Sequence, residues 1–179
     1  MTKFLSFNGI KFCNITCKNL LVKINEEKSF VVAPSGPGLS TIDREINYFI
    51  SLKSADIAIL DSGLFCIFLN LFTQKKVKKL SGYKFLKYYL DYIKDTSTHL
   101  YCIDPDIRSS NMNKLFLKNV GIKSSHYIAP IYNKNFVDYK LLESINYAMP
   151  NVILINIAGG KQEILGNFIN SNINKKIPI

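Results

Sequence analysis

Short apolar runs typical of strands alternate with longer stretches of helical periodicity along almost the whole chain. The strand-like runs are residues 11–15, 29–33, 56–60, 99–103, 125–128, 151–157 and, at the end, 176–179. Such alternation is typical of βαβ units, in which helices cover a sheet of parallel strands. The pattern predicts an α/β, Rossmann-like fold with a mostly parallel sheet and helices on both faces. The length of 179 residues fits a single domain, residues 1–179.

The intervening stretches carry apolar residues at helical spacing: residues 17–27, 41–52, 64–72, 85–93, 105–117, 139–147 and 161–169. In the second of these, a cap at Ser40 or Thr41 precedes an expected buried stripe of Ile42, Ile46, Phe49 and Ile50. The stretch 64–72 is so apolar that we expect a core helix. The breaker-rich residues 34–38 predict a loop.

Charge and composition exclude several classes of protein. The net charge is +10, yet only two of 23 basic residues are arginine, Arg44 and Arg108, which argues against a nucleic-acid partner. The lysine-rich run 75–79 predicts a solvated loop with weak attraction to anionic lipid. No apolar run reaches the roughly 18 residues of a membrane span, and the N-terminus shows no secretory signal. Four scattered cysteines predict free buried thiols in a reducing cytoplasm.

Asp61 stands at the end of a strand-like run and is followed by the small residues Ser62 and Gly63. In open α/β sheets, ligands bind outside the carboxyl ends of the strands. Asp61 could therefore act as a general base that removes a proton from an attacking hydroxyl. The alternative is a helix N-cap, and position alone leaves both open.

A second strand end leads into Gly159-Gly160-Lys161-Gln162-Glu163. Glycines and free amides at a helix start can admit a phosphate. A plain turn followed by a solvated helix start explains the same residues, because the motif is neither a Rossmann fingerprint nor a P-loop. Two polar strand ends together predict one site between them.

Asp104-Pro105-Asp106 spells an Asp-x-Asp that can hold a metal–nucleotide in some glycosyltransferases. Pro105 at the first position of a helix, with Asp104 or Asp106 as its cap, is the favoured interpretation. The two histidines, His99 and His126, have no recognisable nucleophile nearby, so a catalytic triad has no support.

The order of these segments resembles the WecG/TagA/CpsF family of glycosyltransferases (glycosyltransferase family 26). The resemblance runs from about Gly9 to Ile179 and rests on the Ala55-Asp56…Asp61 strand end, on Lys79 to Gly82, and on the 151–155 strand leading to Lys161-Gln162-Glu163. It implies inverting transfer of a sugar, typically an N-acetylhexosamine, from a UDP-sugar donor to a polyprenyl-diphosphate-linked acceptor. Such enzymes serve surface polysaccharide or teichoic-acid-like biosynthesis, at the cytoplasmic face of the cell membrane, as peripheral proteins.

The resemblance also implies roles for particular residues. Asp61 matches the catalytic base. The substrate-binding positions are Ser35, Gly63, Lys79, Gly82, Gly160, Lys161, Gln162 and Glu163, of which Gln162 and Glu163 match the donor-nucleotide pocket. We expect no metal and no cofactor, and a homo-oligomer is possible.

Several positions depart from the family pattern. Ala33 and Ser35 stand where the family has Thr-x-Asn, Ser62 stands at its glycine, Lys79 at its arginine and Gly160 at its proline. The family's C-terminal membrane-contacting appendage is also absent from this sequence, which is what a truncated chain would show. Two alternatives follow: a catalytically inactive nucleotide-binding relative, and a basic nucleic-acid-binding α/β domain.

Overall fold

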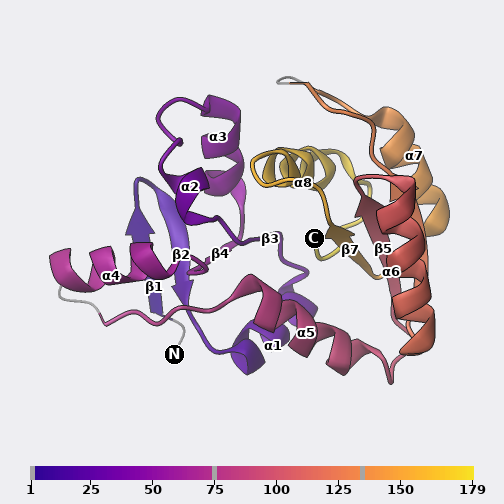
Figure 1. Cartoon of the computed structure of the whole chain (residues 1–179), viewed down its shortest axis with the longest axis horizontal. Helices are drawn as coiled ribbons and strands as arrows, with labels where there is room; N and C mark the ends of the chain where they lie inside the picture. Colours follow the sequence, from indigo (N-terminus) through magenta and orange to yellow (C-terminus); the bar gives the residue numbers. More distant parts are fainter. Residues whose placement is uncertain (1–2, 74–75, 134–135) are drawn as a thin grey trace. The chain divides into compact units, whose positions relative to one another are not determined.

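The computed structural model describes residues 3–73, 76–133 and 136–179 and divides into two compact units, Met1–Tyr89 and Leu90–Ile179 (Figure 1). Each unit contains its own sheet, and parallel strands flanked by helices make up most of both. The predicted α/β, Rossmann-like class is therefore confirmed. The assignment of residues 1–179 to one domain stays a prediction.

The N-terminal unit has the strand order β1-β2-β4-β3, with a parallel β2-β4-β3 core. Its elements are β1 (Lys3–Phe7), β2 (Ile10–Asn14), α1 (Cys17–Glu27), β3 (Val31–Val32), α2 (Gly36–Leu39), α3 (Ile46–Ser54), β4 (Ile57–Ile59), α4 (Gly63–Phe72) and the start of α5 (Gly82–Ile93). All three residues of β4 are buried because the strand lies inside the sheet. The carboxyl end of β4 therefore delivers Leu60 and Asp61 to one edge of the sheet.

The hairpin of β1 and β2 was not predicted from the sequence. Its strands are antiparallel and join at Asn8 and Gly9, which adopt φ of 50° and 79°. Asn-Gly is the pair that a two-residue hairpin turn of this kind favours, because both positions need positive φ. This dipeptide was the signal that could have revealed the hairpin.

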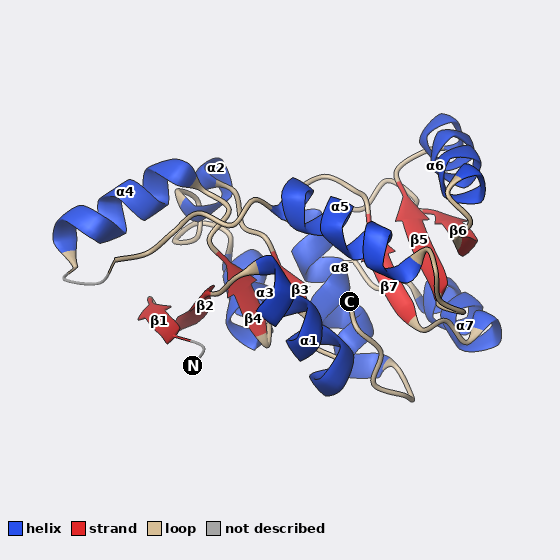
Figure 2. Cartoon of the chain, turned by 90° about the horizontal axis from the view of Figure 1, so that it is seen from below, coloured by secondary structure: helices blue, strands red, loops and turns tan. Residues whose placement is uncertain are grey.

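The C-terminal unit has the strand order β6-β5-β7, all parallel. Its elements are β5 (His99–Asp104), α6 (Ile107–Asn119), β6 (Lys123–Ile128), α7 (Tyr139–Ala148), β7 (Val152–Ile155) and α8 (Lys161–Asn172) (Figure 2). Side chains from the sheet, α7 and α8 form a buried core that includes Ile103, Ile145 and Leu165. Residues 176–179 were predicted to form a strand and do not form one. The Ile153 amide nevertheless donates a hydrogen bond to the Pro178 carbonyl at 2.9 Å.

Predictions about three helical regions were wrong. Residues 36–39, expected in a loop, form α2, because the Ser35 hydroxyl accepts from the Gly38 amide and caps a short turn. Helix α3 begins at Ile46 rather than near Thr41, and Ile46 and Ile50 are 65% and 49% exposed. Helix α4 is not a core helix, because six of its ten residues are exposed.

The remaining strand and thiol predictions hold with adjusted bounds. β3 and β7 are shorter than expected, and β6 starts two residues earlier than the predicted 125–128. The four cysteines, Cys13, Cys17, Cys66 and Cys102, are free thiols, and all but Cys17 are buried.

Candidate functional site

Asp61 lies at the carboxyl end of β4 and is held by the start of α5. Its Oδ1 accepts a hydrogen bond from the Gly82 amide at 3.1 Å. A backbone hydrogen bond of 3.0 Å from the Leu80 amide to the Leu60 carbonyl places the segment before α5 beside the end of β4. Two chain segments that are 21 residues apart therefore meet at the carboxylate.

Asp61 is not the cap of the helix that follows it. That position belongs to Ser62, whose Oγ accepts from the Phe65 amide at 3.2 Å. The N-cap alternative for Asp61 is thus wrong for α4, and the Asp61 carboxylate instead contacts the first residue of α5. Among the described residues, Oδ2 of Asp61 makes no hydrogen bond.

Close approach explains why glycine occupies position 82. A Cβ there would lie 3.2 Å from the Ala33 Cβ and 3.5 Å from Asp61 Oδ2. The carboxyl ends of β3 and β4 and the start of α5 therefore converge on one place, with little room for a larger side chain.

The other site residues predicted in this unit lie around the same strand ends. A Cβ on Gly36 would lie 3.0 Å from Ser62 Oγ, so the Ser35–Gly36 turn is packed against the residue after Asp61. A Cβ on Gly63 would lie 3.7 Å from Lys79 Cδ. The fold thus gathers Ser35, Asp61, Gly63, Lys79 and Gly82 at the carboxyl ends of β3 and β4, which we call the β4-end cluster.

The charges of this cluster act on the buried thiol of Cys66. Burial raises the pKa of Cys66, the neighbouring Lys79 charge lowers it and the Asp61 charge raises it, with a net increase. Its Sγ lies 3.8 Å from the Leu60 carbonyl oxygen, its hydrogen-bond acceptor. Cys66 is therefore an inert thiol that packs beneath the cluster.

The second predicted site segment is the turn between β7 and α8. Gly160 has φ of 84°, a conformation that a proline cannot adopt, so this turn differs from one with proline there. The Gly160 amide donates to Glu163 Oε2 at 2.7 Å, and the Gln162 amide donates to the Ala158 carbonyl at 3.1 Å. A Cβ on Gly159 or Gly160 would meet no atom within 4 Å, so the turn is open on that side.

Glu163 and Lys161 hold this turn in place. The Glu163 side chain is buried, and its Oε1 accepts from Gln162 Nε2 at 3.1 Å. Burial raises the pKa of Glu163, and hydrogen bonds from Gln162, its own amide and Gly160 offset only part of that increase. Lys161 Nζ donates to the Tyr132 carbonyl at 2.6 Å. Both side chains therefore have a structural role, in addition to any contact with a ligand.

The β4-end cluster and the 159–163 turn belong to different units. The expectation that they form one site stays a prediction.

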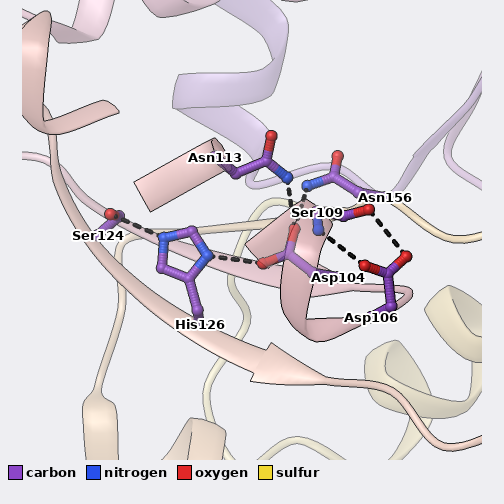
Figure 3. Close-up of polar contacts among 7 residues, drawn as sticks. All are labelled: Asp104, Asp106, Ser109, Asn113, Ser124, His126 and Asn156. Atoms are coloured by element: carbon purple, nitrogen blue, oxygen red, sulfur yellow. Dashed lines mark hydrogen bonds and ion pairs between the residues drawn. The ribbon is translucent and has the colours of Figure 1, made fainter. Parts of the chain in front are cut away.

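The sequence analysis did not predict a polar network centred on Asp104, the last residue of β5. Asp104 is completely buried, and its Oδ1 accepts from Asn113 Nδ2 at 2.7 Å and from Asn156 Nδ2 at 3.1 Å (Figure 3). Its Oδ2 lies 2.6 Å from His126 Nδ1, whose ring partner Nε2 lies 3.0 Å from Ser124 Oγ. We call these five side chains the Asp104 network.

The electrostatics of the network follow from these contacts. Burial raises the pKa of Asp104, but the hydrogen bonds from His126, Asn113 and Asn156 together lower it below its ordinary value. An ionised carboxylate only accepts, so the proton of the short contact is on His126 Nδ1. The network ties the end of β5 and the middle of β6 to Asn156, the first residue after β7, and so fixes the start of the connection to α8.

The Asp-x-Asp motif does not act as a pair. Asp106 is the N-cap of α6, with Oδ1 accepting from the Ser109 amide at 2.7 Å, whereas Asp104 points into its network (Figure 3). Asp106 is thus the cap that the sequence allowed, but Pro105 lies before the cap rather than at the first helical position. Residues 3–73, 76–133 and 136–179 contain no cluster of three or more His, Cys, Asp or Glu side chains suited to a metal ion.

Polar groups at the carboxyl ends of parallel strands are typical of α/β enzymes that bind nucleotide ligands. Residues 5–179 match the model of the glycosyl transferase WecG/TagA/CpsF family. The chain belongs to this glycosyltransferase family, as the resemblance predicted. Curated proteins give no match. Within the described residues, no helix has the length and apolar character to cross a membrane.

Proposed function

We propose that this chain transfers a sugar of the N-acetylhexosamine type from a UDP-sugar to a polyprenyl-diphosphate-linked acceptor. The product belongs to surface polysaccharide or teichoic-acid-like biosynthesis, and the protein acts at the cytoplasmic face of the cell membrane as a peripheral protein. The observation that supports this most is the position of Asp61, a strand-end carboxylate anchored through Oδ1 by the Gly82 amide.

In the proposed reaction, Asp61 Oδ2 accepts the proton of the acceptor hydroxyl. The hydroxyl oxygen attacks the anomeric carbon from the face opposite to UDP, and the bond from that carbon to the diphosphate oxygen breaks. The electron pair of that bond leaves with UDP, so the configuration at the anomeric carbon inverts. The Gly82 amide supports this step by fixing the carboxylate, because small displacements of a reacting group cost large factors in rate.

Negative charge develops on the diphosphate as UDP leaves, and a positive charge beside it stabilises that state. Lys79 belongs to the β4-end cluster and can supply it, together with the amino end of α4 at Gly63. Ser35 is proposed to contact a substrate hydroxyl beside this cluster. No metal or cofactor is proposed for the reaction.

The 159–163 turn is the proposed nucleotide end of the site. Gln162 and the open backbone at Gly160 would contact the uridine, while Lys161 and Glu163 keep the turn in shape through Tyr132 and Gly160. Titration calorimetry with UDP tests this role: Gln162→Ala should weaken UDP binding about tenfold, in line with loss of a buried polar contact. The other glutamine of the sequence, Gln74, lies outside the described residues and cannot serve as a control. The matched control is Asn172→Ala, which removes an exposed amide side chain on the last turn of α8.

The catalytic role of Asp61 is tested by Asp61→Asn. We expect transfer to fall by roughly 10²–10⁴-fold, the usual contribution of a general base, with UDP affinity unchanged. Asp91→Asn, at an exposed position on α5, controls for the loss of one negative charge. Undiminished transfer by Asp61→Asn would exclude Asp61 as the base.

One observation favours the alternative of an inactive nucleotide-binding relative. Ala33 faces Gly82 at the β4-end cluster and offers no hydroxyl there. If the chain is such a relative, the parent chain and Asp61→Asn would both bind UDP, and neither would transfer sugar to any acceptor.

A further inference from the structure

Apart from Asn70, the side chains of α4 are apolar, yet only part of the helix packs against the protein. Cys66 and Leu69 are buried. The exposed side chains recur at the spacing of a single helical face: Leu64 (78% exposed), Ile67 (58%), Phe68 (43%), Leu71 (75%) and Phe72 (73%). We call these five residues the α4 stripe. An apolar face of this kind on an exposed helix marks an interaction surface.

One flank of α4 is anchored to the β1–β2 hairpin, and the Phe68 ring of the stripe also lies near the Phe7 ring, with centroids 6.5 Å apart. The Phe65 ring contacts the Phe7 and Phe12 rings, with centroids 5.1 Å apart in both pairs. Figures 1 and 2 both show the carboxyl-terminal part of α4 extending beyond the other elements of the N-terminal unit. The stripe is thus presented by a helix that is fixed at its base.

A lysine-rich segment is held beside the far end of this helix. The Asn70 side chain bonds both backbone groups of Val77: Oδ1 accepts from the amide at 2.7 Å and Nδ2 donates to the carbonyl at 3.1 Å. Val77 is buried, whereas its neighbours Lys76 and Lys78 are exposed. The backbone at Lys76 and Lys78 is therefore held next to Asn70, near the carboxyl end of α4.

The charge of residues 62–90 indicates what kind of partner binds to the α4 stripe. Residues 62–90 contain six lysines and no aspartate or glutamate. A second copy of the chain on the stripe would bring lysines against lysines, which disfavours a symmetric contact. An anionic bilayer instead offers acyl chains to the apolar side chains and phosphates to the lysines.

We propose that α4 lies in the headgroup layer of an anionic membrane, with the α4 stripe inserted toward the acyl chains and Lys76 and Lys78 on lipid phosphates. The membrane contact of α4 does not depend on the proposed function. Only its consequence for catalysis, the position of Asp61 relative to the acceptor, rests on that function. Ser62 caps α4, so Asp61 lies at the start of a ten-residue helix, about 15 Å long, on the membrane surface. The base would then sit at the depth where the diphosphate of a lipid-linked acceptor lies.

The test is co-sedimentation of the full chain with vesicles of phosphatidylcholine alone and with added phosphatidylglycerol. We expect binding to the anionic vesicles that weakens with added salt. Lys76→Gln/Lys78→Gln should lower the partition coefficient about 25-fold, because each lysine near an anionic surface contributes about fivefold. Leu71→Ser/Phe72→Ser should lower it at least about tenfold on both vesicle types.

Helix α6 offers matched controls, because it also exposes lysines and apolar residues. Lys114→Gln/Lys118→Gln and Leu115→Ser/Phe116→Ser change the same residue types at exposed positions and should leave the partition coefficient within about threefold. Circular dichroism confirms that each variant is folded.

Three results would overturn the inference: no binding to anionic vesicles, equal losses in the α6 variants, or a dimer that Leu71→Ser/Phe72→Ser converts to monomers without any vesicle binding. UDP titration of the same samples separates this failure from failure of the proposed function, since Leu71, Phe72, Lys76 and Lys78 lie outside the proposed site.

Discussion

Replacing Asp104 with alanine would remove the one acceptor that three side chains of the C-terminal unit share. Asn113 and Asn156 donate to Oδ1, and His126 Nδ1 lies 2.6 Å from Oδ2. The side chains of Asp104 and His126 are 0% and 1% exposed, so water cannot replace the lost bond to the imidazole. The two asparagines are half-buried and can recover part of theirs.

The expected cost follows from this difference. A buried hydrogen-bonding group left without a partner costs about 1–3 kcal/mol, and here three side chains lose the same acceptor. We expect Asp104→Ala to lower the free energy of unfolding by about 3–5 kcal/mol, since His126 and both asparagines are affected together. Asp104→Asn should cost less than half as much. Its oxygen still accepts from both asparagines, and His126 can take the other tautomer and donate to Ser124 instead.

Urea denaturation followed by circular dichroism measures these differences. Asp106→Ala is the matched control, because Asp106 is an exposed cap two residues away and should cost less than Asp104→Ala. Equal losses for the two alanine variants would refute the reasoning that burial makes the Asp104 network important.

The pH dependence of the Asp104 effect has a definite sign. The pKa of Asp104 is lower in the folded chain than its ordinary 3.8. Its ionisation therefore stabilises the fold above about pH 3.8, and that contribution is lost as the pH falls through the folded-state pKa. The stability difference between the parent chain and Asp104→Asn should shrink below that pH, and a constant difference would contradict the assignment.

Three further predictions concern other parts of the chain. Gly82→Ala should reduce transfer at least about tenfold while UDP binding is retained, because the added Cβ would lie 3.2 Å from the Ala33 Cβ, so that the start of α5, which fixes Asp61, must shift; steady-state rates and calorimetry check this. Gly160→Pro should lower the free energy of unfolding by about 3 kcal/mol in urea titration, since proline cannot adopt φ of 84° or donate to Glu163; an unchanged midpoint would contradict the turn geometry. Burial and the bond to Asp138 raise the pKa of Tyr127 from 10.0 to about 12, so its contribution to stability is full below pH 10 and is lost as the pH rises from 10 through about 12; the difference in phenolate absorbance between the parent chain and Tyr127→Phe reports the raised pKa.

Much of the architecture could be predicted because local patterns determine it. Apolar runs located β4, β5 and β7, and the residues after two of these runs pointed to Asp61 and to the 159–163 turn. Asp61 was recognisable because a charged residue directly after a buried strand is expected to lie at the end of the sheet, outside the apolar core. The family resemblance marked Gly82 as a substrate-binding position, but not as the residue whose amide donates to Asp61.

The remaining features depend on contacts that no local pattern encodes. The Asp104 network joins residues 22 and 52 positions apart in the sequence, and their meeting depends on the parallel pairing of β5 with β6 and β7. The exposed side of α3 was mispredicted because Tyr48 and Leu52, rather than Ile46 and Ile50, face the core. Apolar periodicity alone also could not distinguish the α4 stripe from a core helix, since both have the same composition.

The central claim, that Asp61 drives inverting transfer from a UDP-sugar, is tested most directly by the anomeric configuration of the product. The parent chain would be incubated with an α-linked UDP-N-acetylhexosamine and a short-chain lipid-diphosphate acceptor, and the product examined by proton NMR beside the Asp61→Asn variant. A β-linked product that forms only with the parent chain is the expected result. An α-linked product, or the same yield from Asp61→Asn, would contradict the account.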